Sequence, residues 1–526
     1  MDRAVFPNSR KTPTHMRIFL TFCLAMEFVG CLAQGTYAQS ASNDTAYTQP
    51  YRNQVHFSPR QNWTNDPNGL VFYEGEYHLF FQHNPLGIRW GHMTWGHAVS
   101  PDLMHWKELS PAITEDTVMA FSGSVVVDER NTSGFGRDGK VPLVAVYTGH
   151  REGNQSQFLA YSLDKGRTWA KYTGNPVLDR NQKDFRDPNV FWHEPSGQWI
   201  MSVVLPQEQR ALFYGSPNLK NWTELGDFAV PNKALGIWEC PAMMPVPIEG
   251  DSTGNRIKWV MLMSVSDGAP AGGSGMQYFV GDFDGKRFVL QDTVTRFLDY
   301  GKDYYAAIQI NNLDRPVTIG WMNNWQYAND IPTSPFRGAM TMPRELSLRK
   351  LPTGYVLHQT LAREVVAIQG NETQIAVIKG IDHTKEANEF VKDADAYELM
   401  IRGSIGNFGV KLKTGPNEET VIGYDSTRRE VYVDRTKSGR ITDNPKFSAR
   451  TTAPLVVETP SGQKTPKPQL TLHIVVDRAA IEVFVDGQQP VTMTNQIFPS
   501  STKPQLEFFG KTLRSIEMRR LDSVWK

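Results

Sequence analysis

Apolar residues in this chain come in short runs separated by turn residues. Examples are residues 143–147 (LVAVY) and 200–205 (IMSVVL), which are flanked by segments rich in Gly, Pro and polar side chains. Runs of this length with many β-branched and aromatic residues are typical of strands buried in a sheet. The pattern therefore predicts an all-β protein.

Three related segments indicate an internal repeat. They are SPDLMHWKEL (100–109), SLDKGRTWAKY (162–172) and SPNLKNWTEL (216–225), and their Trp residues are separated by 63 and 53 residues. Each blade of a β-propeller holds four strands, which suits a unit of this length. The repeat therefore favours a propeller.

A second series of polar residues runs in phase with the first. Its members are spaced by 56, 65, 52 and 64 residues, and each lies among turn residues beside an apolar run: Asp66, Ser122, Asp187, Glu239 and Asp303. If each opens the innermost strand of one blade, all five side chains point toward a common axis. We therefore predict a five-bladed β-propeller over residues 50–356.

The pattern changes beyond about residue 365. Trp is absent until Trp525, and alternating segments such as 470–477 (LTLHIVVD) and 480–487 (AIEVFVDG) dominate. In the first of these, every second residue is apolar and would face one side of a sheet. We predict a C-terminal β-sandwich over residues 366–526, joined by a short helical or irregular linker near 357–366. It shows no catalytic constellation.

The N-terminus has the features of an export signal. Arg10, Lys11 and Arg17 precede an apolar run over 18–33, and Thr-Tyr-Ala at 36–38 gives a small-residue cleavage site. We predict a signal peptide over residues 1–38 and a secreted protein without a transmembrane span. Lipid attachment at Cys31 is the alternative, but the residues before it match a lipoprotein signal poorly.

Charge and cysteine content narrow the picture further. The chain has 55 basic and 55 acidic residues and no net charge, which argues against a nucleic-acid partner. Two of the three cysteines lie in the signal segment, so the mature chain keeps only Cys240 and has no internal disulfide. Its stability must come from a large core.

Three carboxylates of the phased series suggest glycoside hydrolysis: Asp66, Asp187 and Glu239. That reaction needs one acid to protonate the leaving oxygen and one carboxylate to act on the anomeric carbon. Glu239 lies between Trp238 and Cys240, and apolar surroundings would raise its pKa, as a general acid requires. Asp66 lies among polar turn residues that would keep it ionised, as a nucleophile requires.

Six motifs carry a resemblance to a known family. NWTNDPNG, FSGS, FRDP, WECP, DYGKDYYA and GWMNNWQYA occur in the order found in glycoside hydrolase family 32, the invertases, inulinases and levanases. The resemblance implies a five-bladed propeller followed by a β-sandwich. It also implies a retaining mechanism through a covalent fructosyl-enzyme.

The resemblance assigns roles position by position. Asp66 matches the nucleophile, Glu239 the acid/base and Asp187 the transition-state stabiliser. Retention places the two working carboxyl groups about 5–5.5 Å apart. Nine further positions match sugar-binding residues: Trp63, Asn65, Gln82, Trp90, Phe121, Ser122, Arg186, Trp321 and Trp325.

Some of these assignments depend on local geometry. Trp321 and Trp325 are alternative candidates for one stacking wall. Arg186 and Asp187 are neighbours and would point to opposite faces of a regular strand, so both reach a sugar only if the backbone bends there. Thr64 stands where relatives have Met, so the packing behind Asp66 is expected to differ.

The leading hypothesis is an enzyme that releases terminal fructose from levan, inulin or sucrose. The segment WGHMTWGHAVS (90–100) resembles the exo-acting members. The histidines near the motifs lack a ligand cluster, so neither a metal nor another cofactor is implied. The alternatives are a fructosyltransferase, an inverting arabinosidase or xylosidase, whose motifs would differ, and a non-catalytic fructan-binding protein, which would have lost a carboxylate. Linkage preference and acceptor choice stay open.

Overall fold

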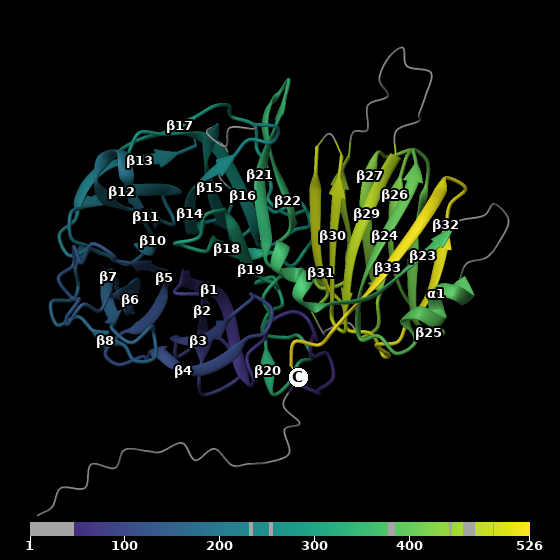
Figure 1. Cartoon of the computed structure of the whole chain (residues 1–526), viewed down its shortest axis with the longest axis horizontal. Coiled ribbons are helices and arrows are strands. Elements are labelled where there is room, and N and C mark those ends of the chain that lie inside the picture. Colours follow the sequence, from purple (N-terminus) through teal and green to yellow (C-terminus); the bar gives the residue numbers. More distant parts are fainter. Residues whose placement is uncertain are drawn as a thin grey trace, which may run out of the picture. The chain divides into compact units, whose positions relative to one another are not determined.

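Regular structure in this chain is almost entirely β-strand, arranged in seven sheets among the residues that the structure describes (Figure 1). The computed structural model describes residues 47–230, 235–251, 256–376, 384–440, 444–455, 469–487 and 489–525. The predicted signal peptide and Cys31 lie outside these residues. No helix within the described ranges is both long enough and apolar enough to cross a bilayer.

The first three sheets follow the chain in order. The first is β20-β1-β2-β3-β4, with β1 at Asn62–Tyr73, β2 at Glu76–Asn84, β3 at Thr94–Ser100, β4 at Lys107–Ile113 and β20 at Phe336–Arg337. The second contains β5 (Met119–Val127), β6 (Leu143–Arg151), β7 (Asn154–Ser162), β8 (Ala170–Lys171) and β9 (Leu178–Gln182). The third contains β10 (Arg186–His193), β11 (Gln198–Leu205), β12 (Arg210–Ser216) and β13 (Thr223–Ala229), with a 3-10 turn at Glu194–Ser196.

Two further sheets complete this part of the chain. The fourth contains β14 (Trp238–Pro247), β15 (Ile257–Val265), β16 (Gly275–Phe283) and β17 (Phe288–Leu290). The fifth contains β18 (Tyr305–Gln309), β19 (Val317–Trp321), β21 (Arg344–Leu351) and β22 (Gly354–Leu361).

The first strands of these five sheets form a closed ring. β1 contacts β5, β5 contacts β10, β10 contacts β14, β14 contacts β18, and β18 contacts β1. The ring closes where Asn311 donates from its backbone N to Leu70 O at 2.8 Å and accepts from Phe72 N at 3.0 Å. This arrangement is a β-propeller, as the repeat predicted, with one sheet per repeat.

Each innermost strand also carries an irregularity in its pairing at a comparable position. The register shifts lie between Thr64 and Pro67, Ala120 and Gly123, Arg186 and Asn189, Glu239 and Ala242, and Tyr305 and Ile308. A β-bulge bends a strand and re-aims a side chain. Asp187 itself has φ 65°. The bend expected between Arg186 and Asp187 is therefore present.

The remaining two sheets form the β-sandwich. One is ordered β23-β33-β24-β29-β30-β31, with β23 at Gln369–Ala376, β24 at Ala396–Ser404, β29 at Gln469–Asp477, β30 at Ala480–Asp486, β31 at Val491–Gln496 and β33 at Leu513–Leu521. The other is β28-β27-β26-β25-β32, with β25 at Phe408–Gly415, β26 at Glu418–Asp425, β27 at Glu430–Lys437, β28 at Arg450–Pro454 and β32 at Gln505–Phe509. A 3-10 helix at Arg363–Ile368 links the sandwich to the propeller, and α1 spans Thr384–Val391.

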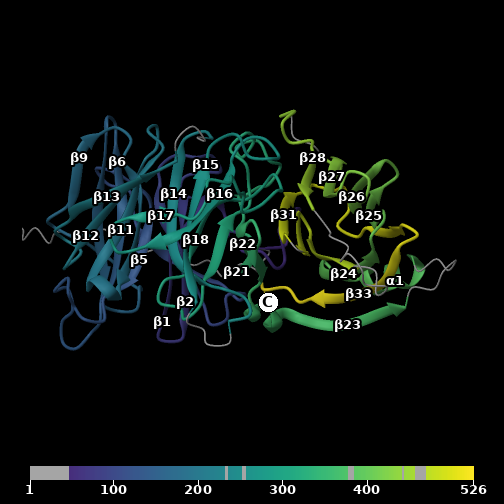
Figure 2. The same ribbon diagram turned by 90° about the horizontal axis from the view of Figure 1, so that it is seen from above.

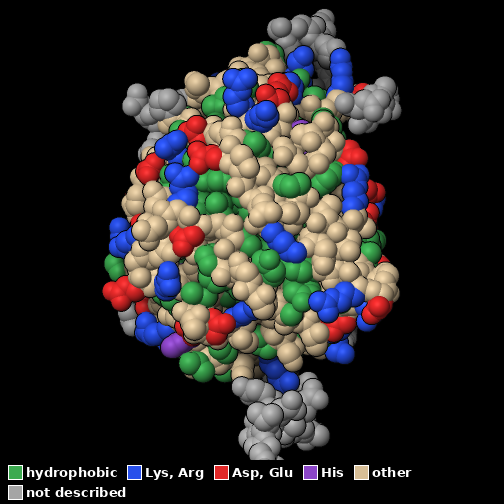
Figure 3. All heavy atoms as spheres, turned by 90° about the vertical axis from the view of Figure 1, so that its left-hand side faces the viewer, with side chains coloured by type: hydrophobic (Ala, Val, Ile, Leu, Met, Phe, Trp, Pro, Cys, Tyr) green, Lys and Arg blue, Asp and Glu red, His purple; other side chains and the backbone are tan. Residues whose placement is uncertain are grey.

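The alternation predicted for residues 470–477 is confirmed. Leu470, Leu472, Ile474 and Val476 are all buried in the core between the two sandwich sheets. On its propeller side the sandwich places β30 and β31 against β22. Figure 2 shows β31 beside β22. Across one face of the molecule, basic and acidic side chains are interspersed (Figure 3).

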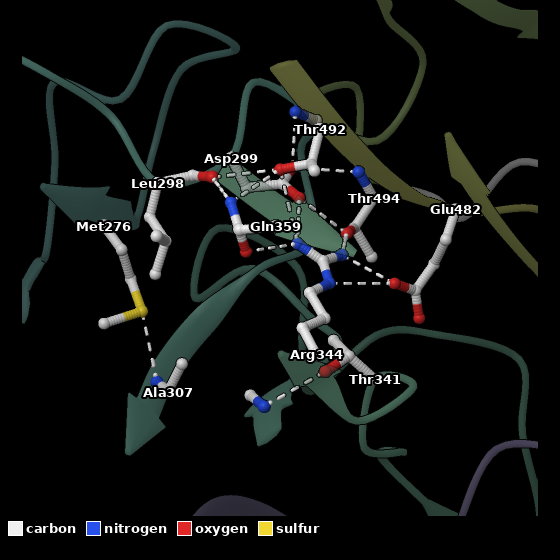
Figure 4. Close-up of polar contacts among 12 residues, drawn as sticks. Met276, Leu298, Asp299, Ala307, Thr341, Arg344, Gln359, Glu482, Thr492 and Thr494 are labelled. Atoms are coloured by element: carbon white, nitrogen blue, oxygen red, sulfur yellow. Dashed lines mark hydrogen bonds and ion pairs between the residues drawn. The ribbon is translucent and has the colours of Figure 1, made fainter. Parts of the chain in front are cut away.

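Buried charges join the propeller to the sandwich. Arg344 on β21 is fully buried, and its guanidinium donates to Asp299 Oδ2 at 3.0 Å and to Glu482 Oε2 of β30 at 2.6 Å (Figure 4). Gln359, Thr492 and Thr494 accept its remaining bonds. Because every charge is paired, its burial is tolerated, whereas removing one partner would leave the others unpaired.

The first and last described segments also meet at this interface. Trp525 Nε1 donates to Asn53 O at 2.7 Å, and Val524 N donates to Gln54 O at 2.9 Å. Nearby, the ring of His56 lies between two sandwich carboxylates, with Nδ1 2.8 Å from Asp477 and Nε2 3.0 Å from Glu482. The N-terminal segment is thus held by residues from the end of the chain.

The prediction that Asp303 points toward the propeller axis is wrong. Its carboxylate is buried at the sandwich interface, where Oδ2 accepts from Arg435 Nη1 at 2.7 Å and from Gln496 N at 2.8 Å. A sandwich cation therefore pairs with this carboxylate. The fifth inward position belongs to Tyr305, two residues later and at the start of β18.

Replacing Arg344 tests the buried network. Arg344→Ala leaves Asp299 and Glu482 buried without their cation, and we expect it to lower the free energy of unfolding by about 3–5 kcal/mol. Arg287→Ala is the control, because this exposed arginine lies 4.0 Å from the exposed Asp284 and its loss should cost only about 0–1 kcal/mol. Denaturant unfolding measures both, and equal losses would contradict the prediction.

Stability should also depend on pH through His56. Its two carboxylate partners raise its pKa from 6.5 to about 9 against the opposing effect of burial. Because the folded pKa is raised, the stabilisation is fully present below pH 6.5 and is lost as the pH rises through 9. Between these values the wild-type protein should lose more thermal stability than His56→Gln, and parallel profiles would contradict this.

Candidate active site

A cavity of about 310 Å³ lies where the innermost strands converge. It is lined by Asn65, Asp66, Gln82, Trp90, Phe121, Ser122, His150, Gln155, Arg186, Asp187, Glu239 and Trp325. A second cavity of about 350 Å³ lies between propeller and sandwich, but no carboxylate lines it. The first cavity is therefore lined by the three predicted carboxylates and by all but two of the site residues predicted from the sequence.

Asp66 lies in the bulge of β1 and is held by two neutral donors. Its Oδ2 accepts from Ser122 Oγ at 2.7 Å and its Oδ1 from Asn65 Nδ2 at 3.0 Å. Burial raises the pKa of Asp66, and the charge of Glu239 raises it further, whereas the two hydrogen bonds lower it. The expectation of a polar turn is wrong here, because residues 63–71 are buried strand.

Asp187 is almost fully buried beside Asp66. Its Oδ2 accepts from Cys240 N at 3.0 Å and lies 3.9 Å from Arg186 Nε. Burial raises the pKa of Asp187, Arg186 opposes this, and the charge of Glu239 adds to it. The buried thiol of Cys240 lies beneath both aspartates, 3.5 Å from Asp66 Oδ2 and 3.8 Å from Asp187 Oδ2.

Glu239 has polar and charged surroundings. Arg186 Nη2 donates to its Oε1 at 2.9 Å, and Tyr305 Oη donates to its Oε2. Trp238 points away and packs against Phe228 and Phe279. The predicted apolar environment is therefore wrong, because neighbours along a strand face opposite sides and the groups that touch Glu239 come from other strands.

Arg186 is the cation of this cluster. Burial alone would lower its pKa, but the charges of Glu239 and Asp187 raise it, so the guanidinium stays protonated. It also donates to Asp184 Oδ1 at 3.1 Å and Gln155 Oε1 at 3.3 Å. One guanidinium thus balances part of the negative charge and fixes the position of Glu239.

Of three predicted tryptophans, one forms part of the cavity wall and two pack behind it. Trp325 lines the cavity, whereas Trp63 and Trp321 are fully buried and do not reach it. Both pack against Trp325, with ring centroids 6.1 Å and 4.8 Å away, and Trp63 Nε1 donates to Asn65 Oδ1 at 2.7 Å. Of the two candidates for the stacking wall, the structure places Trp325 at the surface of the cavity.

Three residues of the site escaped the sequence reasoning. Tyr305 lay inside a recognised motif, DYGKDYYA, so its position in the phased series could have marked it. His150 and Gln155 come from the hairpin between β6 and β7, outside every motif and away from the innermost strands. Among the described residues, no three His, Cys, Asp or Glu side chains are grouped as a metal would require.

This geometry can act on an acetal. A protonated carboxyl group can donate to a leaving oxygen while a second carboxylate stabilises or attacks the developing cation. Asp66 and Asp187 are nearly buried at the inner end of the cavity, whereas Trp90 is 43% exposed. The two aspartates thus lie deeper in the cavity than Trp90.

Comparison with known proteins agrees with the site. The model of the Glycosyl hydrolases family 32 N-terminal domain matches residues 56–360, and that of the family 32 C-terminal domain matches 364–520. A levanase of Bacillus subtilis is 43% identical over 98% of this chain and 76% of its own length. An extracellular exo-inulinase of Aspergillus awamori is 39% identical over 91% of this chain and 96% of its own.

Solved structures resemble the fold over nearly the same length. The crystal structure of exo-inulinase from Aspergillus awamori superposes with a TM-score of 0.81 at 36% identity, over 91% of this chain and all of that one. The β-fructofuranosidase of Schwanniomyces occidentalis complexed with fructosyl-erythritol gives 0.78 at 32% identity, over 92% of this chain and all of that one. Since the two family models together account for the propeller and the sandwich, the chain belongs to glycosyl hydrolases family 32.

Proposed function

We propose that this protein hydrolyses β-fructofuranosidic bonds and releases terminal fructose from levan, inulin or sucrose. The observation that carries the proposal is the cavity in which Asp66, Asp187 and Glu239 converge around Arg186. The similarity to a levanase and to exo-inulinases supports the substrate class. The exo-inulinases among the relatives support attack on a chain end.

In the first step Asp66 acts as nucleophile. Its carboxylate attacks the anomeric carbon while Glu239 gives its proton to the departing oxygen, so that the glycosidic bond breaks and a fructosyl ester forms on Asp66. Ser122 and Asn65 hold the attacking carboxylate. Asp187 accepts hydrogen bonds from hydroxyl groups of the fructosyl ring as positive charge develops there.

In the second step Glu239 acts as base. It takes a proton from a water molecule that attacks the fructosyl ester, which frees fructose with retained configuration and restores the Asp66 carboxylate. Arg186 and Tyr305 hold the Glu239 carboxyl group through both steps. Trp325 and Phe121 offer apolar ring faces to the sugar.

We also propose that the protein is exported. The basic residues, apolar run and small-residue site of the N-terminus support this. The exo-inulinases it resembles are extracellular. N-terminal sequencing of protein recovered outside the cells would test it, and a mature chain that still begins at Met1 would contradict the proposal.

The activity test separates the possible outcomes by product size. Purified protein is incubated with levan, inulin and sucrose, and products are resolved over time. Free fructose from the first time point is the expected result. A ladder of short oligomers would instead indicate internal cleavage, and products longer than the substrate would indicate transfer to sugar.

The role of Glu239 predicts a large loss of turnover. Glu239→Gln keeps the shape of the side chain but cannot exchange a proton, so kcat on fructans should fall by at least about a hundredfold. Glu208→Gln is the control, because Glu208 is exposed and pairs with Arg210 outside the cavity. Near-normal turnover by the Glu239 variant would exclude the acid/base assignment.

The role of Asp66 predicts loss of the covalent intermediate. Asp66→Asn should show no turnover above background while it still binds fructose. In the Glu239→Gln variant, acid quenching during turnover of a fructoside with a good leaving group should trap one fructosyl unit on a peptide from β1. Mass spectrometry measures both, and a fructosyl group on another peptide would refute the assignment.

A further inference from the structure

His150 enters the cavity from a hairpin that no catalytic motif includes. It lies near the end of β6, two residues from the turn Glu152-Gly153, and is paired directly with Gln155 at the start of β7. Residues paired across antiparallel strands project to the same face. Both side chains line the cavity.

The contacts of Gln155 determine which nitrogen of His150 carries the proton. Gln155 Oε1 accepts from Phe185 N at 2.9 Å and from Arg186 Nη1 at 3.3 Å, so this oxygen is already committed. Its Nε2 therefore faces His150 Nδ1, at 3.2 Å. An amide nitrogen only donates, so Nδ1 accepts and the proton is on Nε2.

Burial and the neighbouring charge keep the ring in this neutral form. Burial lowers the pKa of His150, Arg186 lowers it further, and Asp184 opposes them. Within the described residues no acceptor bonds to His150 Nε2, whose N–H is left available. The ring thus presents one donor on a fixed axis.

His150 lies among the more exposed rings that line the cavity. Its ring stacks on Phe121 with centroids 4.4 Å apart and planes at 7°, and the exposed Trp90 packs edge-on against the same Phe121 at 6.0 Å. The aspartates are buried deeper than these rings. A sugar unit whose bond is cleaved at the aspartates leaves its neighbouring unit beside the rings at the mouth.

We propose that His150 determines specificity for the leaving group, donating from Nε2–H to a hydroxyl of the sugar unit next to the cleaved bond. This rests on the proposed fructosidase function and adds a residue to its substrate recognition. The Phe121–His150 stack fixes the ring and offers its face to that unit. Gln155 Nε2 bonds His150 Nδ1 and so fixes the orientation and tautomer of the ring.

Two substrates distinguish recognition of the leaving group by His150 from a general effect of this residue on catalysis. In methyl β-D-fructofuranoside the leaving group is methanol and has no further hydroxyl, whereas a short inulin oligomer leaves a hydroxylated sugar. His150→Phe keeps the stack but loses the donor, and kcat/KM on the oligomer should fall roughly three- to tenfold, mainly through KM. On methyl fructoside the kcat/KM of this variant should stay within about twofold of the wild-type value, because no hydrogen bond to the leaving group is lost.

Matched variants make the result decisive. His150→Gln keeps an N–H donor and should recover part of the activity on the oligomer. His105 is exposed and lies outside the cavity, so His105→Phe should change kcat/KM on neither substrate. Equal loss on both substrates, or no loss on the oligomer, would overturn the proposal. If the wild-type protein cleaves neither substrate, the proposed fructosidase function fails, a result distinct from failure of the His150 assignment.

Discussion

The concentration of three carboxylates at the axis of the propeller is the constraint on which the site depends. Like charges in a poorly solvated cavity disfavour one another, so each needs compensation. Arg186 contacts Asp187 and Glu239, whereas Asp66 is held by neutral donors. The compensating groups come from different blades, and only the closed ring brings them together.

The β-bulges of the innermost strands bring the charged side chains and the groups that compensate them into the same cavity. A regular strand would send Arg186 and Asp187 to opposite faces, and only one could reach the cavity. With φ 65° at Asp187 the strand bends and both line the cavity. Because all five innermost strands are irregular at comparable positions, the same device is repeated around the axis.

The sequence predicted site residues correctly where they occupy equivalent positions in successive repeats. Four residues could be placed together because each occupies an equivalent position in its blade: Asp66, Ser122, Asp187 and Glu239. The spacing defines that position only to within a few residues, which is why it indicated Asp303, whereas Tyr305 is the residue that contacts Glu239. Asp303 pairs with Arg435, more than a hundred residues away, and no local pattern reports such a contact.

Environments were harder to predict than positions. The polar turn expected around Asp66 and the apolar surroundings expected around Glu239 were inferred from neighbours along the chain. In the folded protein Trp238 turns away from Glu239, and Arg186 and Tyr305 approach from two other strands. His150 lay outside the reasoning altogether, because it belongs to the second strand of its blade and has no carboxylate or motif beside it.

The contact between the two ends of the described chain has a consequence for biosynthesis. Domains made first usually fold first as the ribosome delivers the chain. Here Asn53, Gln54 and His56 bind residues between Asp477 and Trp525, so the N-terminal segment gains these contacts only after the sandwich has been synthesised. A nascent propeller without its sandwich stays incomplete, and a truncated chain lacks the contacts that would hold its beginning in place.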